Sequence, residues 1–322
     1  MDQHSAKPED LPPLPLRRVR DLDLAESTGE GSPPHLSAAS GIVRRGSFAY
    51  VIGDDELFLA AFDLTGSEPG TLHRVLEGEL PGDEAERKAA KPDLEALTAL
   101  PPLEGAPHGG LLGLGSGSGE RRDRGFFWAL EPDGALHGDP LTIELGPLYE
   151  RLRGEVGEVN VEGAAVLEDR LWLFNRGNED ASINAVAQIE VSDLATSLRT
   201  DRELDADELA SVREYDLGEV EGVKLCFSDA TAPFTDVIVF TASAEGERDG
   251  DIHGSLIGTV NGAGKVQRLR SIDPRWKVEG VHASVDAGVV DLVFVCDQDD
   301  PDVPSPLLSA TMPLDARFEH HA

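Results

Sequence analysis

The chain has 322 residues, of which 61 are acidic and 28 basic, so its formal net charge is −33. This balance argues against a nucleic-acid-binding protein, because such proteins present clustered basic residues. No stretch of the sequence is apolar over the ~18 consecutive residues that a membrane span requires. The acidic residues are spread along the whole chain, which favours a strongly solvated surface over a single cation-binding patch.

The first 15 residues are polar and rich in proline. We therefore expect residues 1–15 to form a flexible tail. Because they lack the apolar core of a secretory signal, we expect a cytoplasmic protein. The two cysteines, Cys226 and Cys296, lie in apolar runs and not in a CxxC pair. They are predicted to be small buried residues, not members of a disulfide or a metal site.

The next segment, residues 16–24, alternates apolar and charged residues, a pattern typical of an edge strand. Five repeats follow, each made of short strand-like runs separated by turn residues. We predict a helix over residues 83–90, between the first two repeats, and a short helix over 205–212 within the third. The repeats cover about 37–80, 91–146, 159–218, 224–273 and 277–314.

Each repeat opens with the same phrase: an acidic or hydroxyl residue, then a small residue, then a run of strand-forming residues. Successive phrases are 50 to 67 residues apart, and self-similarity on this scale is typical of a propeller-like array. The opening residues are Ser40, Glu95, Glu162, Asp229 and Glu279.

The fifth repeat has only three strand-like runs, and the spare strand at 16–24 can supply the fourth. We therefore predict an all-β, five-bladed β-propeller as a single domain over residues 16–322, in which the N-terminal strand completes the last blade and closes the ring. A β-sandwich or two small β domains would also contain regular short strands. Neither alternative explains the repeated opening phrase.

The opening residues are candidate metal ligands. The first strand of each propeller blade lines the central channel, where equivalent positions of all blades meet. Four facing carboxylates cannot all stay ionised without a counter-charge. Ca²⁺ supplies one and takes oxygen ligands in a flexible shell, whereas zinc and copper favour sites with nitrogen or sulfur. The alternative is that each acid is an exposed residue at the start of a strand.

Two nearby residues are excluded from this ring. Glu221 lies too far ahead of the next strand to match the spacing of the other repeats. His282 follows Glu279 at an odd spacing, so strand alternation predicts that its side chain points away from the channel.

Polar loops follow the second strand of each repeat, and binding residues gather on such loops over a rigid scaffold. Asp54 and Asp55 are candidate bases and Arg176 a candidate catalytic cation. Hydroxyl, amide and basic side chains nearby are candidates for holding a phosphate or carboxylate. The alternative for each is a solvated rim. The anion-binding candidates are Lys91, Ser116, Arg121, Arg122 and Asn178.

The chain also resembles known propellers. The order of the opening residues, with Phe227-Ser228-Asp229-Ala230 in the fourth repeat, is similar to that of the soluble calcium-activated nucleotidases (apyrases). Lys91 to Leu97, Leu114 to Ser118 and Asn160 to Ala164 resemble motifs of an uncharacterised bacterial family. The Asp/Glu-Gly openings are also similar to those of esterase-like and phytase-like propellers. The nucleotidase resemblance implies a five-bladed propeller with one Ca²⁺ in its central channel.

Two functions follow from these expectations. The first is metal-assisted hydrolysis of a phosphate ester or anhydride, in which the cation polarises a phosphoryl oxygen or activates water. The second is a non-catalytic propeller in which Ca²⁺ holds the blades together and the rim binds a ligand or protein. No nucleophile or phosphate-loop motif is present in the sequence. The expected partner is a small anionic substrate, neither nucleic acid nor a membrane is expected as a partner, and the sequence does not identify a protein partner.

Overall fold

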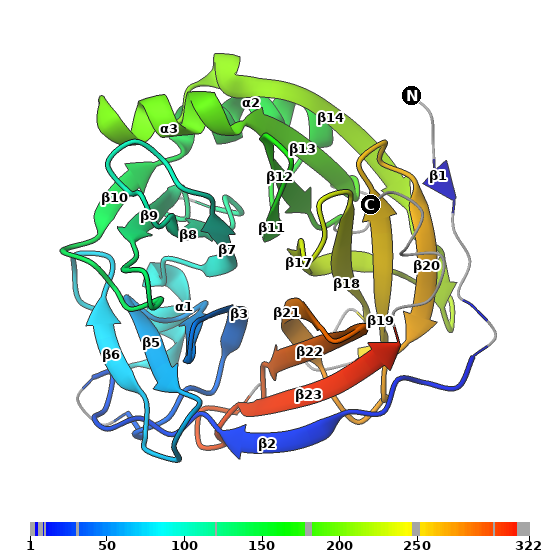
Figure 1. The fold of residues 1–322 in the computed structure, drawn as a ribbon, viewed down its shortest axis with the longest axis horizontal. Coiled ribbons are helices and arrows are strands. Elements are labelled where there is room, and N and C mark those ends of the chain that lie inside the picture. The colour runs from blue at the N-terminus through cyan, green and yellow to red at the C-terminus, as the bar shows by residue number, and fades with distance from the viewer. Residues whose placement is uncertain are drawn as a thin grey trace.

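The computed structural model describes residues 4–5, 9, 11–29, 32–119, 121–177, 182–246, 252–298 and 300–313. Its strands form five small sheets arranged around a central axis as the blades of a propeller, as the sequence predicted (Figure 1). The innermost strand of each blade is also its first in chain order, except that the third and the last blades each take an outermost strand from the N-terminal segment. Among the described residues, no helix is both long enough and apolar enough to cross a membrane.

The first two blades are four-stranded antiparallel sheets in sequential order. The first contains β3 (Ala39–Arg45), β4 (Phe48–Gly53), β5 (Phe58–Asp63) and β6 (Thr71–Arg74). The second contains β7 (Leu94–Leu100), β8 (Gly110–Gly115), β9 (Arg124–Ala129) and β10 (Leu141–Glu144). The predicted helix between them is present as α1 (Glu84–Ala90), and Asp83 caps it by accepting a hydrogen bond from the Glu86 amide.

The third blade contains β11 (Val161–Leu167), β12 (Arg170–Asn175), β13 (Ala185–Glu190) and β14 (Leu209–Asp216), with the short β1 (His4–Ser5) parallel to β14 at its edge. Helix α2 (Gly146–Val156) precedes this blade, and α3 (Val191–Arg199) lies inside it. The helix predicted over 205–212 is wrong. Asp205 and Glu208 form a capping box on a single 3-10 turn, η1 (Ala206–Glu208), and the chain then enters β14.

The fourth blade contains β17 (Cys226–Thr231), β18 (Val237–Glu245), β19 (Ile252–Asn261) and β20 (Val266–Ser271). A small hairpin, β15 (Glu219–Val220) with β16 (Val223–Lys224), leads into it. The fifth contains β21 (Val278–Asp286), β22 (Val289–Cys296) and β23 (Pro306–Pro313). Its fourth strand is β2 (Arg17–Asp21), which pairs antiparallel with β23. Closure by the N-terminal strand is therefore confirmed.

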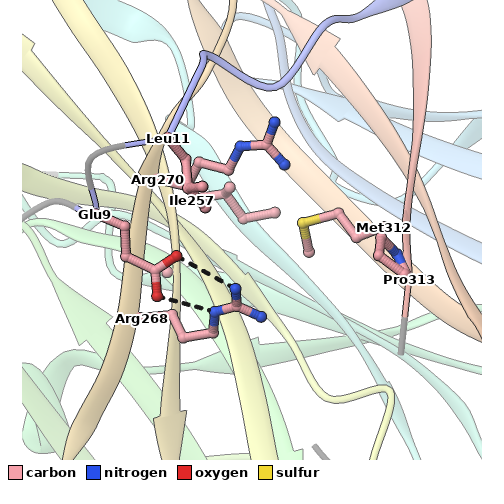
Figure 2. Close-up of a pocket in the computed structure, with 8 residues that line it drawn as sticks. Glu9, Leu11, Ile257, Arg268, Arg270, Met312 and Pro313 are labelled. Atoms are coloured by element: carbon pink, nitrogen blue, oxygen red, sulfur yellow. Dashed lines mark hydrogen bonds and ion pairs between the residues drawn. The ribbon is translucent and has the colours of Figure 1, made fainter. Parts of the chain in front are cut away.

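Residues just before β2 lie against the fourth blade, although the sequence suggested a flexible segment there. The amides of Glu9 and Leu14 donate to the carbonyls of Leu269 and Ser271 on β20, and the Leu14 side chain is buried. Figure 2 shows the Glu9 carboxylate paired with the Arg268 guanidinium, at 3.1 Å between Nε and the carboxylate oxygen. The chain before β2 therefore bridges the fourth and fifth blades.

Five apolar clusters hold the blades together, one at each interface between neighbouring blades. Because consecutive side chains of a strand point to opposite faces of its sheet, each blade contributes apolar residues to the two clusters on either side of it. The inner strands approach closely at small residues. A Cβ on Gly163 would lie 2.7 Å from the Asp229 backbone of the next blade, and one on Gly280 would lie 2.9 Å from the Ser40 carbonyl oxygen of the first. Small residues after the opening positions therefore allow the channel to close.

Candidate metal centre at one end of the channel

All five inner strands carry the same irregularity near their start. In each, one residue has no partner on the second strand, and the register shifts around it as in a β-bulge. Since the inner strands all run in the same direction along the axis, these bulges gather at one end of the channel. We call this end the bulge mouth and define it by the unpaired residues, Ser40, Glu95, Glu162, Ser228 and Glu279.

In the fourth blade the bulge falls on Ser228, one residue before Asp229. Phe227 pairs with Ala242 and Asp229 with Thr241, so Ser228 is the residue left out. Asp229 instead corresponds to the small residue that follows each bulge elsewhere, such as Gly163. Of the predicted metal ligands, the structure thus brings four to the bulge positions and places Asp229 one position further along its strand.

Asp229 is fully buried and links two blades. One carboxylate oxygen accepts a hydrogen bond from its neighbour's amide, Ala230 N, at 2.7 Å, and the other accepts from Val281 N on the fifth blade, also at 2.7 Å. Burial raises the pKa of Asp229 well above its usual range, although the two amides oppose this. Both oxygens are occupied by backbone donors, so this carboxylate acts as a tie between inner strands.

A compact acidic group lies on the first- and second-blade side of the bulge mouth. Asp54, Asp93 and Glu95 each place a carboxylate oxygen within 4.8 Å of the others, and together they could hold a metal ion. Asp54 lies in the β4–β5 turn, and Asp93 lies just before β7. Lys91, at the C-terminal end of α1, is ion-paired with Asp54 and lies 2.7 Å from Asp93.

Two further carboxylate–cation clusters complete the bulge mouth. In the third blade, the Arg176 guanidinium lies 3.6 Å from Glu162 and 2.7 Å from Glu245 of the next blade. In the fifth blade, the Lys277 ammonium lies 3.4 Å from Glu279 and 3.2 Å from Asp297. The side chains of Arg176 and Lys277 are only 13% and 15% exposed. These cations are held beside the bulge carboxylates and do not extend into solvent.

The bulge carboxylates are poorly solvated and repel one another. Burial, followed by repulsion from Glu162 and Asp93, raises the pKa of Glu95 well above its usual range. Burial also raises the pKa of Glu162 to about 7, even though Arg176 opposes it. The pKa of Glu279 is raised well above normal by burial and then by Glu245. A positive charge added to this site would therefore stabilise the ionised forms of these carboxylates at neutral pH.

The residues at the bulge mouth fit a hard divalent cation. Their donors are carboxylate and hydroxyl oxygens, the ligands that Ca²⁺ prefers. The Ser228 hydroxyl is buried and has no hydrogen-bond partner among the described residues, and an orphaned buried hydroxyl of this kind calls for a missing partner. Carboxylates also outnumber cations among the described residues of this region. The carboxylates are Asp54, Asp93, Glu95, Glu162, Glu245, Glu279 and Asp297, and the cations are Lys91, Arg122, Arg176 and Lys277.

The predicted catalytic residues lie near this mouth and are engaged by other side chains. Asp54 pairs with Lys91, and burial raises the pKa of Asp54 to about 6 against the effect of Lys91. Asp55 lies further out, where its carboxylate accepts from the Arg87 guanidinium of α1 at 2.9 Å. Arg176 occupies the cluster with Glu162 described above.

The predicted anion-binding residues are divided between the site and its surroundings. Ser116 and Arg122 both hydrogen-bond to Asp93, with Arg122 Nη1 at 2.8 Å. Together with Lys91, these contacts outweigh burial and lower the pKa of Asp93. Arg121 is exposed in the same loop and has a positive φ of 73°. Asn178 lies outside the described residues.

Sequence reasoning missed Ser228, Asp93, Glu245 and Lys277. Asp93 and Lys277 stand two residues before Glu95 and Glu279, a spacing that a search for charged residues flanking each opening phrase would have found. The position of the bulge in the fourth blade left no such signal, because both Ser228 and Asp229 fit the opening phrase.

Glu221 and His282, which the sequence excluded from the ring of metal ligands, lie in different surroundings. Glu221 lies in the β15–β16 turn with its side chain 75% exposed, away from the bulge mouth. The expectation that His282 points away from the channel is wrong. The bulge at Glu279 inserts one residue and shifts the alternation, so His282 lines the opposite end of the channel.

Comparison with known proteins gives structural similarities and one family match. No curated protein sequence matches it. The catalytic domain of a GH62 α-L-arabinofuranosidase from Coprinopsis cinerea is similar in structure, with 10% identity, a TM-score of 0.53, and coverage of 93% of this chain and 98% of that one. The mannose phosphorylase MPT-4 from Leishmania mexicana, solved with a phosphate ion, gives 12% identity, a TM-score of 0.48, and coverage of 95% and 91%. A luciferin-regenerating enzyme gives 11% identity, a TM-score of 0.43, and coverage of 87% and 92%.

At such low identities, structural similarity speaks to fold and not to activity. The sequence comparison is more specific, since the model of a family of unknown function, DUF6929, matches residues 35–312. That match runs from just before the inner strand of the first blade to the third strand of the fifth. The chain therefore belongs to the DUF6929 family of unknown function.

Proposed function

We propose that this propeller binds one Ca²⁺ ion at the bulge mouth. The supporting observation is that all five inner strands bulge at the same position and there present only oxygen-bearing side chains. One of these, Ser228, is buried and has no hydrogen-bond partner among the residues that the structure describes. Glu95, Glu162 and Glu279 would supply charged ligands, and Ser40 and Ser228 neutral ones. The order of these residues is also the one that the likeness to calcium-activated nucleotidases implies.

Cation binding would rearrange the ion pairs at this mouth. Arg176 pairs with Glu162, which the ion would also use, and Lys91 pairs with Asp93, whose carboxylate lies beside that of Glu95 and could turn to the ion with it. When those carboxylates turn to the ion, the ammonium and guanidinium groups become available to an anion. This exchange supports the proposed catalytic role, in which Lys91, Arg122 and Arg176 hold a phosphate ester or anhydride and Asp54 accepts a proton from water. Bound Ca²⁺ would polarise a phosphoryl oxygen.

The second candidate function is non-catalytic, with Ca²⁺ holding the blades together. The observation that favours it is the hydrogen bond from Ser40 Oγ to the Leu94 carbonyl at 2.6 Å, together with the Asp229–Val281 tie. Both contacts link neighbouring blades at this mouth, so an ion beside them would reinforce the ring.

The experiment strips the protein with chelator and then measures Ca²⁺ binding by calorimetry and by melting temperature. A ligand that binds only the folded state at about 100 times its Kd adds about 2.7 kcal/mol of stability, so the melting temperature should rise. Glu162→Gln should lose most of this gain. Glu155→Gln, which removes an exposed carboxylate on the surface of α2, is the matched control. If wild type shows no Ca²⁺ binding, the proposal fails.

A second measurement separates the two functions. Hydrolysis of nucleotides, phytate and an aryl phosphate is followed with Ca²⁺ and with chelator. Turnover that chelator abolishes and that Arg176→Gln reduces supports the hydrolase. Ca²⁺-dependent stabilisation without any turnover supports the non-catalytic function.

A further inference from the structure

The opposite end of the channel has a different chemistry. A cavity of about 230 Å³ opens there, lined by the C-terminal halves of the five inner strands and the residues that follow them. We call it the second mouth. Its polar side chains are those of Arg45, Thr98, Thr231, His282 and Ser284.

Among the described residues that line the second mouth, the charged side chain is that of a cation, Arg45, although the net charge of the protein is −33. No aspartate or glutamate is among the described residues that line it. The Arg45 side chain is exposed to the cavity and makes no ion pair or hydrogen bond within the described part of the chain. Arg44, on the other face of the same strand, has a buried Nε that finds no hydrogen-bond partner in the part of the chain that the structure describes.

The pKa of His282 is affected by the same arginines. The imidazole is partly buried at the second mouth. Burial, followed by repulsion from Arg45 and Arg44, lowers the pKa of His282 to about 3. The imidazole is therefore neutral at physiological pH and offers one N–H donor. The hydroxyls of Thr98, Thr231 and Ser284 add further donors around the cavity.

We propose that the second mouth binds a small oxyanion. The Arg45 guanidinium would hold it through two parallel N–H donors, the geometry that carboxylates and phosphates accept. The His282 N–H and the threonine and serine hydroxyls would bind its remaining oxygens. A cavity of about 230 Å³ admits inorganic phosphate or a short carboxylate. This site lies at the opposite end of the inner strands from the bulge mouth and does not depend on Ca²⁺.

The test uses the His282 imidazole as a probe. The full chain is labelled with [¹³C]histidine and titrated with inorganic phosphate, and separately with acetate, in the presence of chelator. The His282 signal is assigned from the spectrum of His282→Asn. We expect a saturable shift of that signal. An anion favours the charged form of a nearby base, so phosphate should also raise the pKa of His282. Saturation by phosphate alone identifies a phosphate site, and saturation by both identifies a general oxyanion site.

Arg45→Gln should weaken the affinity about tenfold or more, because hydrogen bonds to a charged partner are the strong ones. Arg151→Gln is the matched control. It removes the same charge from the exposed surface of α2 and should leave the titration unchanged. Glu162→Gln at the bulge mouth should also leave it unchanged, so failure of the Ca²⁺ proposal would not affect this result. No saturable shift with either anion, or equal affinity in Arg45→Gln, would overturn the proposal. Arg45→Lys keeps the measurement decisive if the glutamine variant does not fold.

Discussion

Glu162→Gln should make the calcium-free protein more stable at neutral pH. In the folded protein, burial raises the pKa of Glu162 from 4.5 to about 7 despite the nearby Arg176. When the pKa of a carboxyl is higher in the folded than in the unfolded state, the protein loses stability as the pH rises from the unfolded pKa to the folded pKa. Ionisation of Glu162 therefore costs the folded state about 3 kcal/mol above pH ~7. Glutamine has the shape of the protonated acid and does not carry this cost.

The expected difference depends on pH, which makes it specific. From the two pKa values, about 2 kcal/mol of this cost develops between pH ~5 and pH ~7.5. The free energy of unfolding of the variant should therefore rise by this amount relative to that of wild type across the interval. Chemical denaturation in the presence of chelator measures both proteins at both pH values. Glu155→Gln should keep the wild-type pH dependence, because its carboxylate is exposed on α2. If Glu162→Gln and wild type lose stability in parallel as the pH rises, the ionised Glu162 carboxylate does not destabilise the folded protein and the reasoning is refuted.

Three further changes test other parts of the channel. Ser228→Ala removes a buried hydroxyl that has no partner within the described segments of the chain, so chemical denaturation of the calcium-free protein should show a gain of up to about 1 kcal/mol, while calorimetry should show weaker Ca²⁺ binding; a loss of apo stability would mean that the hydroxyl has a partner. Asp229→Ala fits a position that is small in the other blades but leaves two amides without acceptors, so it should cost about 2–5 kcal/mol and leave the Ca²⁺ affinity close to wild type. Deletion of residues 1–24 removes β2 and the buried Leu22 and Leu24, so it should cost about 4 kcal/mol or more and expose β23 as an edge; an unchanged melting temperature would mean that the ring does not need this strand.

The fold was predictable because its signals are local and repeat along the chain. Short strand-forming runs and turn residues recur in every blade, and the fifth repeat lacked one strand while the N-terminus had one to spare. The helix over 205–212 was mispredicted because Asp205 and Glu208 form a true helix-start signal that ends after a single turn. Local sequence specified the start of that helix, and pairing of the following residues with β13 ended it.

The site was less predictable because its geometry depends on bulges. Strand alternation assigns each side chain to a face, and one inserted residue reverses the assignment for the rest of the strand. That is why His282 lines the channel although counting from Glu279 placed it outside. The same shift makes Ser228, and not Asp229, equivalent to the other opening residues. The local sequence does not show whether Ser228 or Asp229 lacks a partner on the neighbouring strand, because the register is decided by contacts with β18.

The parallel course of the inner strands explains why the two ends of one channel differ in charge. Each inner strand starts at the bulge mouth, so the opening phrase concentrates carboxylates there, and each ends at the second mouth, where Arg45 and His282 lie. The carboxylates are buried against low-dielectric blades, where charge interactions are stronger than in water. A strongly acidic surface also raises the local concentration of cations. The acidic composition would therefore assist the cation binding that we propose at the bulge mouth, where the described inner strands gather buried acids, while the same strands place Arg45 at the opposite end of the channel.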